Sequence, residues 1–178
     1  MEGLVRPSLN ADRNMGAHLE FLSLSEQNTV ALGVAIGRIL GPGDVILLYG
    51  DLGSGKTRFA KGVVSAATGV PDDDVVSPTF TLINSFTGGL TVHHADLYRI
   101  EPNRTDDLGL EEAVDEGDAL IVEWPDKADQ WDENRLEITI GPLEQPNARR
   151  ITFAWRPSSD WNARLSDLAA TYEALKQE

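Results

Sequence analysis

The stretch that decides the fold is Val45-Ile46-Leu47-Leu48-Tyr49-Gly50-Asp51-Leu52-Gly53-Ser54-Gly55-Lys56-Thr57. Its first five residues are a continuous apolar run, which is typical of a strand buried on both faces of a parallel sheet. The remaining eight match the pattern G-x-x-x-x-G-K-S/T, and residues 57–67 predict a helix directly after it. A strand, a glycine-rich loop and a helix in this order predict a P-loop, which binds the phosphates of a nucleoside triphosphate.

Each part of this loop has a chemical role. Glycines allow the backbone N–H groups to surround the phosphates, Lys56 neutralises the β- and γ-phosphate oxygens, and the Thr57 hydroxyl ligates Mg²⁺. The expected phosphate-binding residues are Asp51, Leu52, Gly53, Ser54, Gly55, Lys56 and Thr57.

The segments on either side predict further helices and strands. A helix is expected from the N-cap Ser25 until Gly41-Pro42-Gly43 ends it, and a closing amphipathic helix includes residues 165–175. Strands are expected at residues 80–86, 90–97, 119–124, 136–140 and 150–155. Gly88-Gly89 predicts an antiparallel hairpin between the first two of these strands, and the last two suit an edge hairpin.

We therefore predict an α/β fold, a P-loop NTPase-like three-layer sandwich with a mixed, mostly buried central sheet. Residues 1–20 show no apolar periodicity and predict a flexible N-terminal extension. Residues 21–178 predict a single P-loop ATPase domain, because no linker, repeat or low-complexity tract divides them.

Composition excludes several classes of protein. Fifteen Lys and Arg against 29 Asp and Glu give a net charge of −14, which disfavours strong direct binding to tRNA or other nucleic acid. The absence of cysteine excludes disulfides and thiolate metal sites and fits a reducing compartment. No apolar run is long enough to cross a membrane, so a cytoplasmic location is expected.

Two carboxylates follow apolar runs and resemble a Walker B residue. Asp96 ends the run that begins at Leu90, and Glu123 ends Ala119-Leu120-Ile121-Val122. Mg²⁺ usually takes one or two protein carboxylates, and the sequence does not rank these two. His93 and His94 could contact a nucleotide or a partner, but with no Cys or spaced His they make a poor metal site. Structural or solvated histidines are the favoured interpretation.

Four motifs together resemble the TsaE (YjeE) family: the P-loop, Ser77-Pro78-Thr79-Phe80-Thr81, His94-Ala95-Asp96-Leu97-Tyr98-Arg99 and Val122-Glu123-Trp124-Pro125. The resemblance runs from about Leu24 to Pro125 and is weak elsewhere. It implies a bacterial ATPase required, with the proteins TsaB and TsaD, for N6-threonylcarbamoyladenosine at position 37 of tRNAs that read ANN codons.

The resemblance also implies roles for single residues. Lys56, Asp96 and Glu123 would be catalytic, and Thr57 and Glu123 would hold Mg²⁺. Trp124 would lie close to the ATP, and Glu26 near its adenine; otherwise Glu26 is an acid stabilised at a helix N-terminus. Ser77-Pro78-Thr79 falls where a loop that senses the γ-phosphate, or a plain loop-to-strand junction, is expected.

The expected reaction is phosphoryl transfer to water, and no arginine finger is identifiable. Arg99, Arg104, Arg149 and Arg150 are the candidates for reaching the site. If a partner supplies this group, hydrolysis by the isolated protein is slow and partner-dependent.

Three other functions remain open. A small-molecule kinase uses the same P-loop, although the acidic segment 101–117 disfavours a second phosphorylated substrate. A GTPase would need guanine recognition, which Asp126-Lys127-Ala128-Asp129 matches only faintly. In a nucleotide-gated interaction module, ATP orders a loop for docking and hydrolysis resets it.

Overall fold

The structure is a computed structural model that describes residues 10–12, 16–78, 81–101, 108–128, 131 and 134–174. Its strands are β1 (Asn10–Asp12), β2 (Gly16–Ser23), β3 (Val45–Tyr49), β4 (Ile83–Phe86), β5 (Val92–Asp96), β6 (Ala119–Glu123), β7 (Arg135–Pro142) and β8 (Arg149–Trp155). Its α-helices are α1 (Glu26–Gly37), α2 (Lys56–Thr68), α3 (Leu110–Asp115) and α4 (Trp161–Ala174), and two short 3₁₀ turns cover Asp72–Asp74 and Pro125–Lys127.

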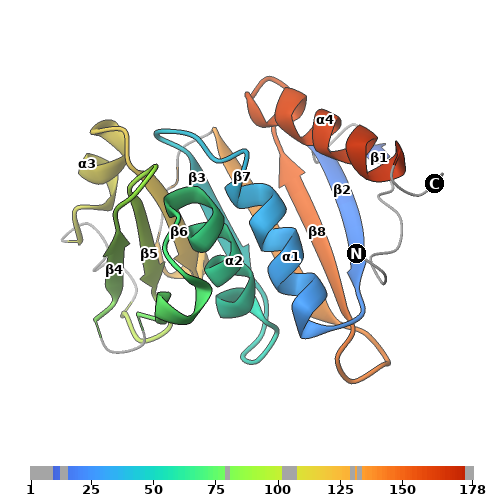
Figure 1. The fold of residues 1–178 in the computed structure, drawn as a ribbon, viewed down its shortest axis with the longest axis horizontal. Coiled ribbons are helices and arrows are strands. Elements are labelled where there is room, and N and C mark those ends of the chain that lie inside the picture. The colour runs from blue at the N-terminus through green and yellow to red at the C-terminus, as the bar shows by residue number, and fades with distance from the viewer. Residues whose placement is uncertain are drawn as a thin grey trace.

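Within the described residues, eight strands form one sheet in the order β1-β2-β8-β7-β3-β6-β5-β4 (Figure 1). The central strands β7, β3, β6 and β5 pair in parallel, whereas β4–β5, β7–β8, β2–β8 and β1–β2 are antiparallel. The predicted mixed sheet and the predicted β4–β5 hairpin are confirmed.

The two faces of the sheet pack against different elements. Alternate residues of β3 point to opposite faces: Ile46 and Leu48 join a core with α1, α2 and α4, whereas Val45 and Leu47 join a core with α3. Figure 1 shows α1 and α2 lying side by side across one face. The predicted layered α/β fold is confirmed, and α3 is a helix that the sequence did not indicate.

Strand β2 contradicts two of the predictions. Residues 16–20 do not belong to a flexible extension, because β2 pairs along its whole length with β8. Leu19 and Phe21 are buried in the core, and Phe21 packs against Phe153 with ring centroids 5.1 Å apart. As a result, β7 and β8 form the predicted hairpin, but this hairpin lies inside the sheet and not at its edge.

Other boundaries differ by a few residues from those expected. Ser25 is the N-cap of α1, where its hydroxyl accepts a hydrogen bond from the Asn28 N–H, but the helix ends at Gly37, before the glycines that were expected to stop it. The strand expected from residue 80 begins at Ile83. Thr79, Phe80, Arg104, Asp129 and Leu175 lie outside the described residues.

The parallel strands bring distant residues to one edge of the sheet. β3, β5 and β6 all end at this edge, and across β5 and β6 Asp96 is the register partner of Glu123. Because the P-loop also starts there, after Tyr49, the two predicted strand-end carboxylates lie next to the N-terminus of α2.

Candidate nucleotide-binding site

The loop between β3 and α2 takes a conformation that requires glycine. Gly50 has φ of 140°, and a Cβ atom there would lie 2.3 Å from the carbonyl oxygen of Ile140 on β7. Gly55 has φ of 110° and is the N-cap residue of α2. The backbone therefore curls tightly and leaves the first N–H groups of α2 facing the hollow of the loop, an arrangement that suits an anion.

Lys56 lies across this hollow. Its Nζ donates hydrogen bonds to the carbonyl oxygens of Gly50 (2.7 Å) and Asp51 (3.0 Å) and lies 3.8 Å from the centroid of the Trp124 ring. The residue is 4% exposed, and burial lowers the pKa of its ammonium, against the nearby charges of Glu123 and Asp96. Trp124 adopts φ of 60°, an uncommon value for a residue with a side chain.

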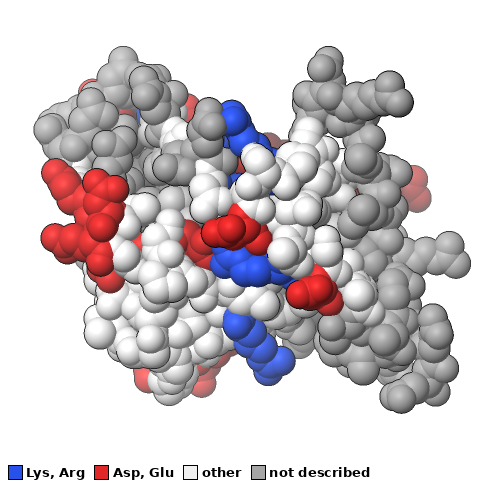
Figure 2. Space-filling model, turned by 90° about the horizontal axis from the view of Figure 1, so that it is seen from above, with Lys and Arg blue, Asp and Glu red and all other residues white. Residues whose placement is uncertain are grey.

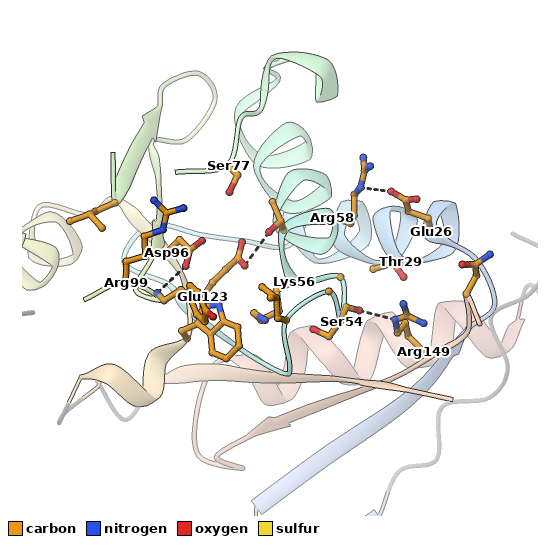
Figure 3. A pocket seen from close by; sticks show the side chains of 18 residues that line it. Glu26, Thr29, Ser54, Lys56, Arg58, Ser77, Asp96, Arg99, Glu123 and Arg149 are labelled. Atoms are coloured by element: carbon orange, nitrogen blue, oxygen red, sulfur yellow. Dashed lines mark hydrogen bonds and ion pairs between the residues drawn. The ribbon is translucent and has the colours of Figure 1, made fainter. Parts of the chain in front are cut away.

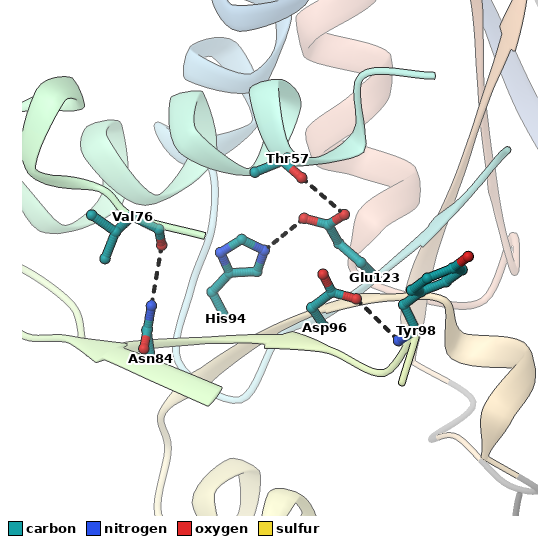
Figure 4. Close-up of polar contacts among 7 residues, drawn as sticks. All are labelled: Thr57, Val76, Asn84, His94, Asp96, Tyr98 and Glu123. Carbon is teal, nitrogen blue, oxygen red and sulfur yellow. Dashed lines mark hydrogen bonds and ion pairs between the residues drawn. The ribbon is translucent and has the colours of Figure 1, made fainter. Parts of the chain in front are cut away.

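A chain of hydrogen bonds links α2 to the sheet (Figure 4). The Thr57 hydroxyl donates to Oε2 of Glu123 at 3.1 Å, and Nε2 of His94 lies 2.9 Å from Oε1 of the same carboxylate. Glu123 and His94 are both buried. The two oxygens of Glu123 are thus held from opposite sides by different elements.

Asp96 lies beside this chain. Its Oδ1 accepts a hydrogen bond from the Tyr98 N–H at 3.0 Å. Burial raises the pKa of the Asp96 carboxyl, and the charge of Glu123 adds to the rise, while the Tyr98 hydrogen bond opposes it. Asp96 and Glu123 are therefore neighbouring carboxyl groups with different environments.

These residues border a pocket of about 510 Å³ (Figure 3). At one end lie Asp96 and Glu123, close to Ser77 and Arg99. At the other end Arg58 and Glu26 form an ion pair near Thr29, and the β7–β8 turn contributes Asn147 and Arg149. The pocket thus has one end lined by the two carboxylates and another lined by residues of α1, α2 and the β7–β8 hairpin.

The structure brings the predicted site residues together. Glu26, Leu52, Gly53, Ser54, Gly55, Lys56, Thr57, Asp96, Glu123 and Trp124 all line the pocket. Asp51, also predicted, is not a pocket-lining residue, and its carbonyl oxygen accepts a hydrogen bond from Lys56. Ser77 lines the pocket, whereas Thr79 of the same motif lies outside the described residues.

The candidate arginines separate into two groups. Arg99 and Arg149 line the pocket, and Nε of Arg149 donates to the Ser54 carbonyl oxygen at 2.9 Å. Arg150 instead pairs with Glu20 on β2, and Arg104 lies outside the described residues. No sequence signal connects Arg149 to Ser54, which lies 95 positions earlier.

His94 is a site residue that the sequence interpretation missed. It was expected to be structural or solvated, but its ring contacts Glu123. A signal was present, because residues two apart on a strand share a face, and His94 lies two residues before Asp96. His93 points the other way and bonds Ser85 and Asp118, as the structural interpretation expects.

Other site types find little support in the described part of the chain. There, no group of three or more His, Asp or Glu side chains forms a metal-binding cluster. Asp126 and Lys127 lie in a 3₁₀ turn and are not pocket-lining residues, and Asp129 of the faint guanine motif is outside the described residues. Among the described helices, none has the length and apolar character to cross a membrane.

Comparison with known proteins gives one consistent result. Residues 23–151 match the family described as Threonylcarbamoyl adenosine biosynthesis protein TsaE. The tRNA threonylcarbamoyladenosine biosynthesis protein TsaE of Treponema pallidum (strain Nichols) is 36% identical over 135 residues, which cover 75% of this chain and 98% of that protein. Its namesake in Bacillus subtilis (strain 168) is 37% identical over 138 residues, covering 76% and 84%.

A solved structure agrees with these matches. The crystal structure of YdiB from Bacillus subtilis superposes with a TM-score of 0.70 and 28% sequence identity, over 88% of this chain and 96% of that one. The family match spans the whole pocket, whose lining residues run from Glu26 to Arg149.

Proposed function

This chain belongs to the TsaE family of threonylcarbamoyl adenosine biosynthesis proteins, and we propose that it serves the pathway by binding and hydrolysing ATP with Mg²⁺. In this proposal it acts with TsaB and TsaD in the modification of adenosine 37 of tRNAs that read ANN codons. The observation that carries the proposal is the contact between Thr57 at the start of α2 and Glu123 at the end of β6. It joins a P-loop hydroxyl to a strand-end carboxylate.

The residues present fit a magnesium ion. The Thr57 hydroxyl and the Glu123 carboxylate are the hard oxygen ligands that Mg²⁺ prefers, and Mg²⁺ usually takes only one or two ligands from the protein. When bound, the ion would neutralise charge that develops on the phosphate oxygens. The buried Oγ of Ser54 has no hydrogen-bond partner in the loop, which leaves it available to a phosphate oxygen.

Different groups of the protein have different roles in the proposed hydrolysis. The N–H groups of the P-loop and the Lys56 ammonium hold the phosphates, since a phosphate oxygen can replace the carbonyl groups that Lys56 now contacts. In this proposal Asp96, whose carboxyl pKa is raised by burial, orients the attacking water and accepts its proton. Glu26 and Arg58 at the far end of the pocket are placed to contact the base or ribose.

In this proposal the rim of the pocket is the surface that the partners contact. Leu52 at the tip of the P-loop is 76% exposed and Tyr98 is 48% exposed, and both line the pocket. Contiguous exposed apolar surface marks protein–protein contact sites, and in this proposal Leu52 and Tyr98 contribute to such a contact. We therefore expect slow hydrolysis by the isolated protein and faster turnover when TsaB and TsaD close the site.

The test is ATP turnover by the purified protein with Mg²⁺, alone and with TsaB and TsaD, using Lys56→Ala as the control. We expect turnover to rise at least tenfold with the partners and to vanish in the variant. Release of inorganic phosphate without any acceptor separates hydrolysis from a kinase, and competition between ATP and GTP tests the base. Fast turnover by the isolated protein that the partners leave unchanged would disprove the partner-dependent mechanism.

The competing function is a nucleotide-gated interaction module. The exposed rim favours it equally, because nucleotide binding alone could order the surface that a partner contacts. A Glu123→Ala protein that cannot hydrolyse ATP separates the two. If it still supports repeated rounds of tRNA modification, ATP binding is the useful event and hydrolysis is not.

A further inference from the structure

His94 has an unusual environment for a core residue. Its side chain on β5 is 0% exposed, and its Nε2 lies 2.9 Å from Oε1 of Glu123. Its other ring nitrogen, Nδ1, is buried without a hydrogen-bond partner. An apolar side chain would fill the same space without burying an unpartnered nitrogen, so packing alone does not account for an imidazole here.

The polar contact that His94 does make is directed at one group. A carboxylate only accepts hydrogen bonds, so Nε2 carries the proton in the contact with Glu123. Thr57 donates to the second oxygen of the same carboxylate, and in Figure 4 Glu123 lies between the two donors. The pair fixes both the position and the rotation of the carboxylate plane.

We propose that His94 is a positioning residue that holds Glu123 in the orientation required to bind the magnesium of Mg·ATP. This inference rests on the proposed function and adds to it a residue that touches neither nucleotide nor metal. Carboxylates that bind metals are held by outer hydrogen bonds, and loss of such a partner typically lowers metal affinity 10- to 100-fold. Without His94, Oε1 of Glu123 would lose its donor, and the carboxylate would be free to rotate.

The neighbouring histidine supplies a matched control. His93 precedes His94 on the same strand, but it faces the other side of the sheet, where its ring bonds Ser85 and Asp118 at 2.8 Å each. A change at His93 therefore removes a histidine and two hydrogen bonds from the same strand without touching Glu123. Any general effect of disturbing β5 should appear in both variants.

The experiment measures ATP binding by calorimetry, in EDTA and across a Mg²⁺ titration, for wild type, His94→Leu, His94→Gln and His93→Leu. We expect His94→Leu to bind ATP in EDTA as wild type does, because the P-loop and Lys56 are intact, but to need 10- to 100-fold more Mg²⁺. Glutamine carries an N–H donor at a distance similar to Nε2, so His94→Gln should recover most of the Mg²⁺ dependence. His93→Leu should match wild type.

A double-mutant comparison separates positioning from a general structural effect. In a Glu123→Ala background, His94→Leu should leave the Mg²⁺ dependence unchanged, because the group through which it acts is gone. The proposal is overturned if folded His94→Leu keeps the wild-type Mg²⁺ dependence, if it loses ATP binding equally in EDTA, or if His94→Gln is no better than His94→Leu. If wild type itself shows no Mg²⁺ dependence, the proposed function fails instead.

Discussion

Asp96 and Glu123 lie opposite each other across two strands, yet their surroundings give them different chemistry. Glu123 receives hydrogen bonds on both oxygens, whereas Asp96 has one from the Tyr98 backbone and a pKa raised by burial. A carboxyl with a raised pKa is a better proton acceptor, and one held by two donors is a better fixed ligand. The sequence positions of Asp96 and Glu123 did not distinguish the proposed proton acceptor from the proposed Mg²⁺ ligand, because both residues end apolar strands.

Replacing Asp96 by Asn should separate activity from stability. The amide oxygen still accepts from Tyr98, but it takes no proton, so ATP turnover should fall about 100-fold or more. Because the folded pKa is raised, ionisation of Asp96 lowers stability as pH rises from the unfolded carboxyl pKa through the folded value. Asp96→Asn should therefore be more stable than wild type at pH 7, with the difference shrinking in acid.

Urea unfolding at several pH values, without nucleotide or Mg²⁺, measures this difference. Asp72→Asn is the control, because Asp72 is an exposed carboxylate in a 3₁₀ turn, and its removal should change neither stability nor turnover. A variant at position 96 that keeps more than a tenth of wild-type turnover would show that Asp96 is not the proton acceptor.

At the scale of elements, the β7–β8 hairpin fixes one side of the P-loop. Arg149 at the start of β8 donates from Nε to the Ser54 carbonyl and from Nη1 to the carbonyls of Pro146 and Ala148. Arg149→Ala should weaken ATP binding about tenfold. Hydrogen bonds from a charged donor contribute roughly 1.5–3 kcal/mol, and because Arg149 supports the P-loop through Ser54, only part of this free energy should affect the affinity for ATP. Calorimetry measures the affinity.

Arg150→Ala is the matched control for this hairpin. Arg150 is the next residue, but its side chain pairs with Glu20 on β2, at an exposed place away from the pocket. An exposed ion pair contributes little to stability, so this variant should bind ATP as wild type does. Equal losses in both variants would indicate that the hairpin as a whole, and not the contact to Ser54, supports the loop.

Strand β2 makes an element-scale prediction about stability. Phe21 is buried between β2 and the helices, against Phe153, so Phe21→Ala should lower the free energy of unfolding by about 3–5 kcal/mol. Leu24→Ala, at a position 41% exposed just after the strand, should change it by about 0.5 kcal/mol or less. A loss below about 1 kcal/mol at Phe21 would contradict the assignment of β2 to the core.

The same strand shows where prediction from sequence ended. Local patterns were sufficient for β3, the P-loop and the carboxylates at the ends of β5 and β6, because strand ends in a parallel sheet meet at one edge. The alternation in Leu19 and Phe21 was too short to identify β2, whose partner β8 lies more than 120 positions later. Contacts such as Arg149 to Ser54 depend on the pairing of β7 with β3, strands that lie far apart in the sequence, and no local pattern encodes them.

At the scale of the whole molecule, the net negative charge opposes binding of nucleic acid by the isolated protein. The chain carries a net charge of −14. On the face drawn in Figure 2, one group of acidic side chains lies at the left and others lie at the centre and right, while the Lys and Arg side chains among the described residues occupy separate places. Binding to a phosphate backbone requires several cations in a continuous surface, since each neutralised phosphate adds to affinity by releasing counterions.

We therefore expect the isolated protein not to bind tRNA measurably at physiological salt. In the proposed assembly TsaB and TsaD supply the contacts to tRNA, so tRNA should bind only when they are present. The salt dependence of this tRNA affinity should be close to that measured for TsaB and TsaD without this protein. Fluorescence anisotropy of labelled tRNA, with and without Mg·ATP, measures both cases. Micromolar binding by the isolated protein, weakened steeply by added salt, would show a basic surface that net charge conceals and would place tRNA in direct contact with this chain.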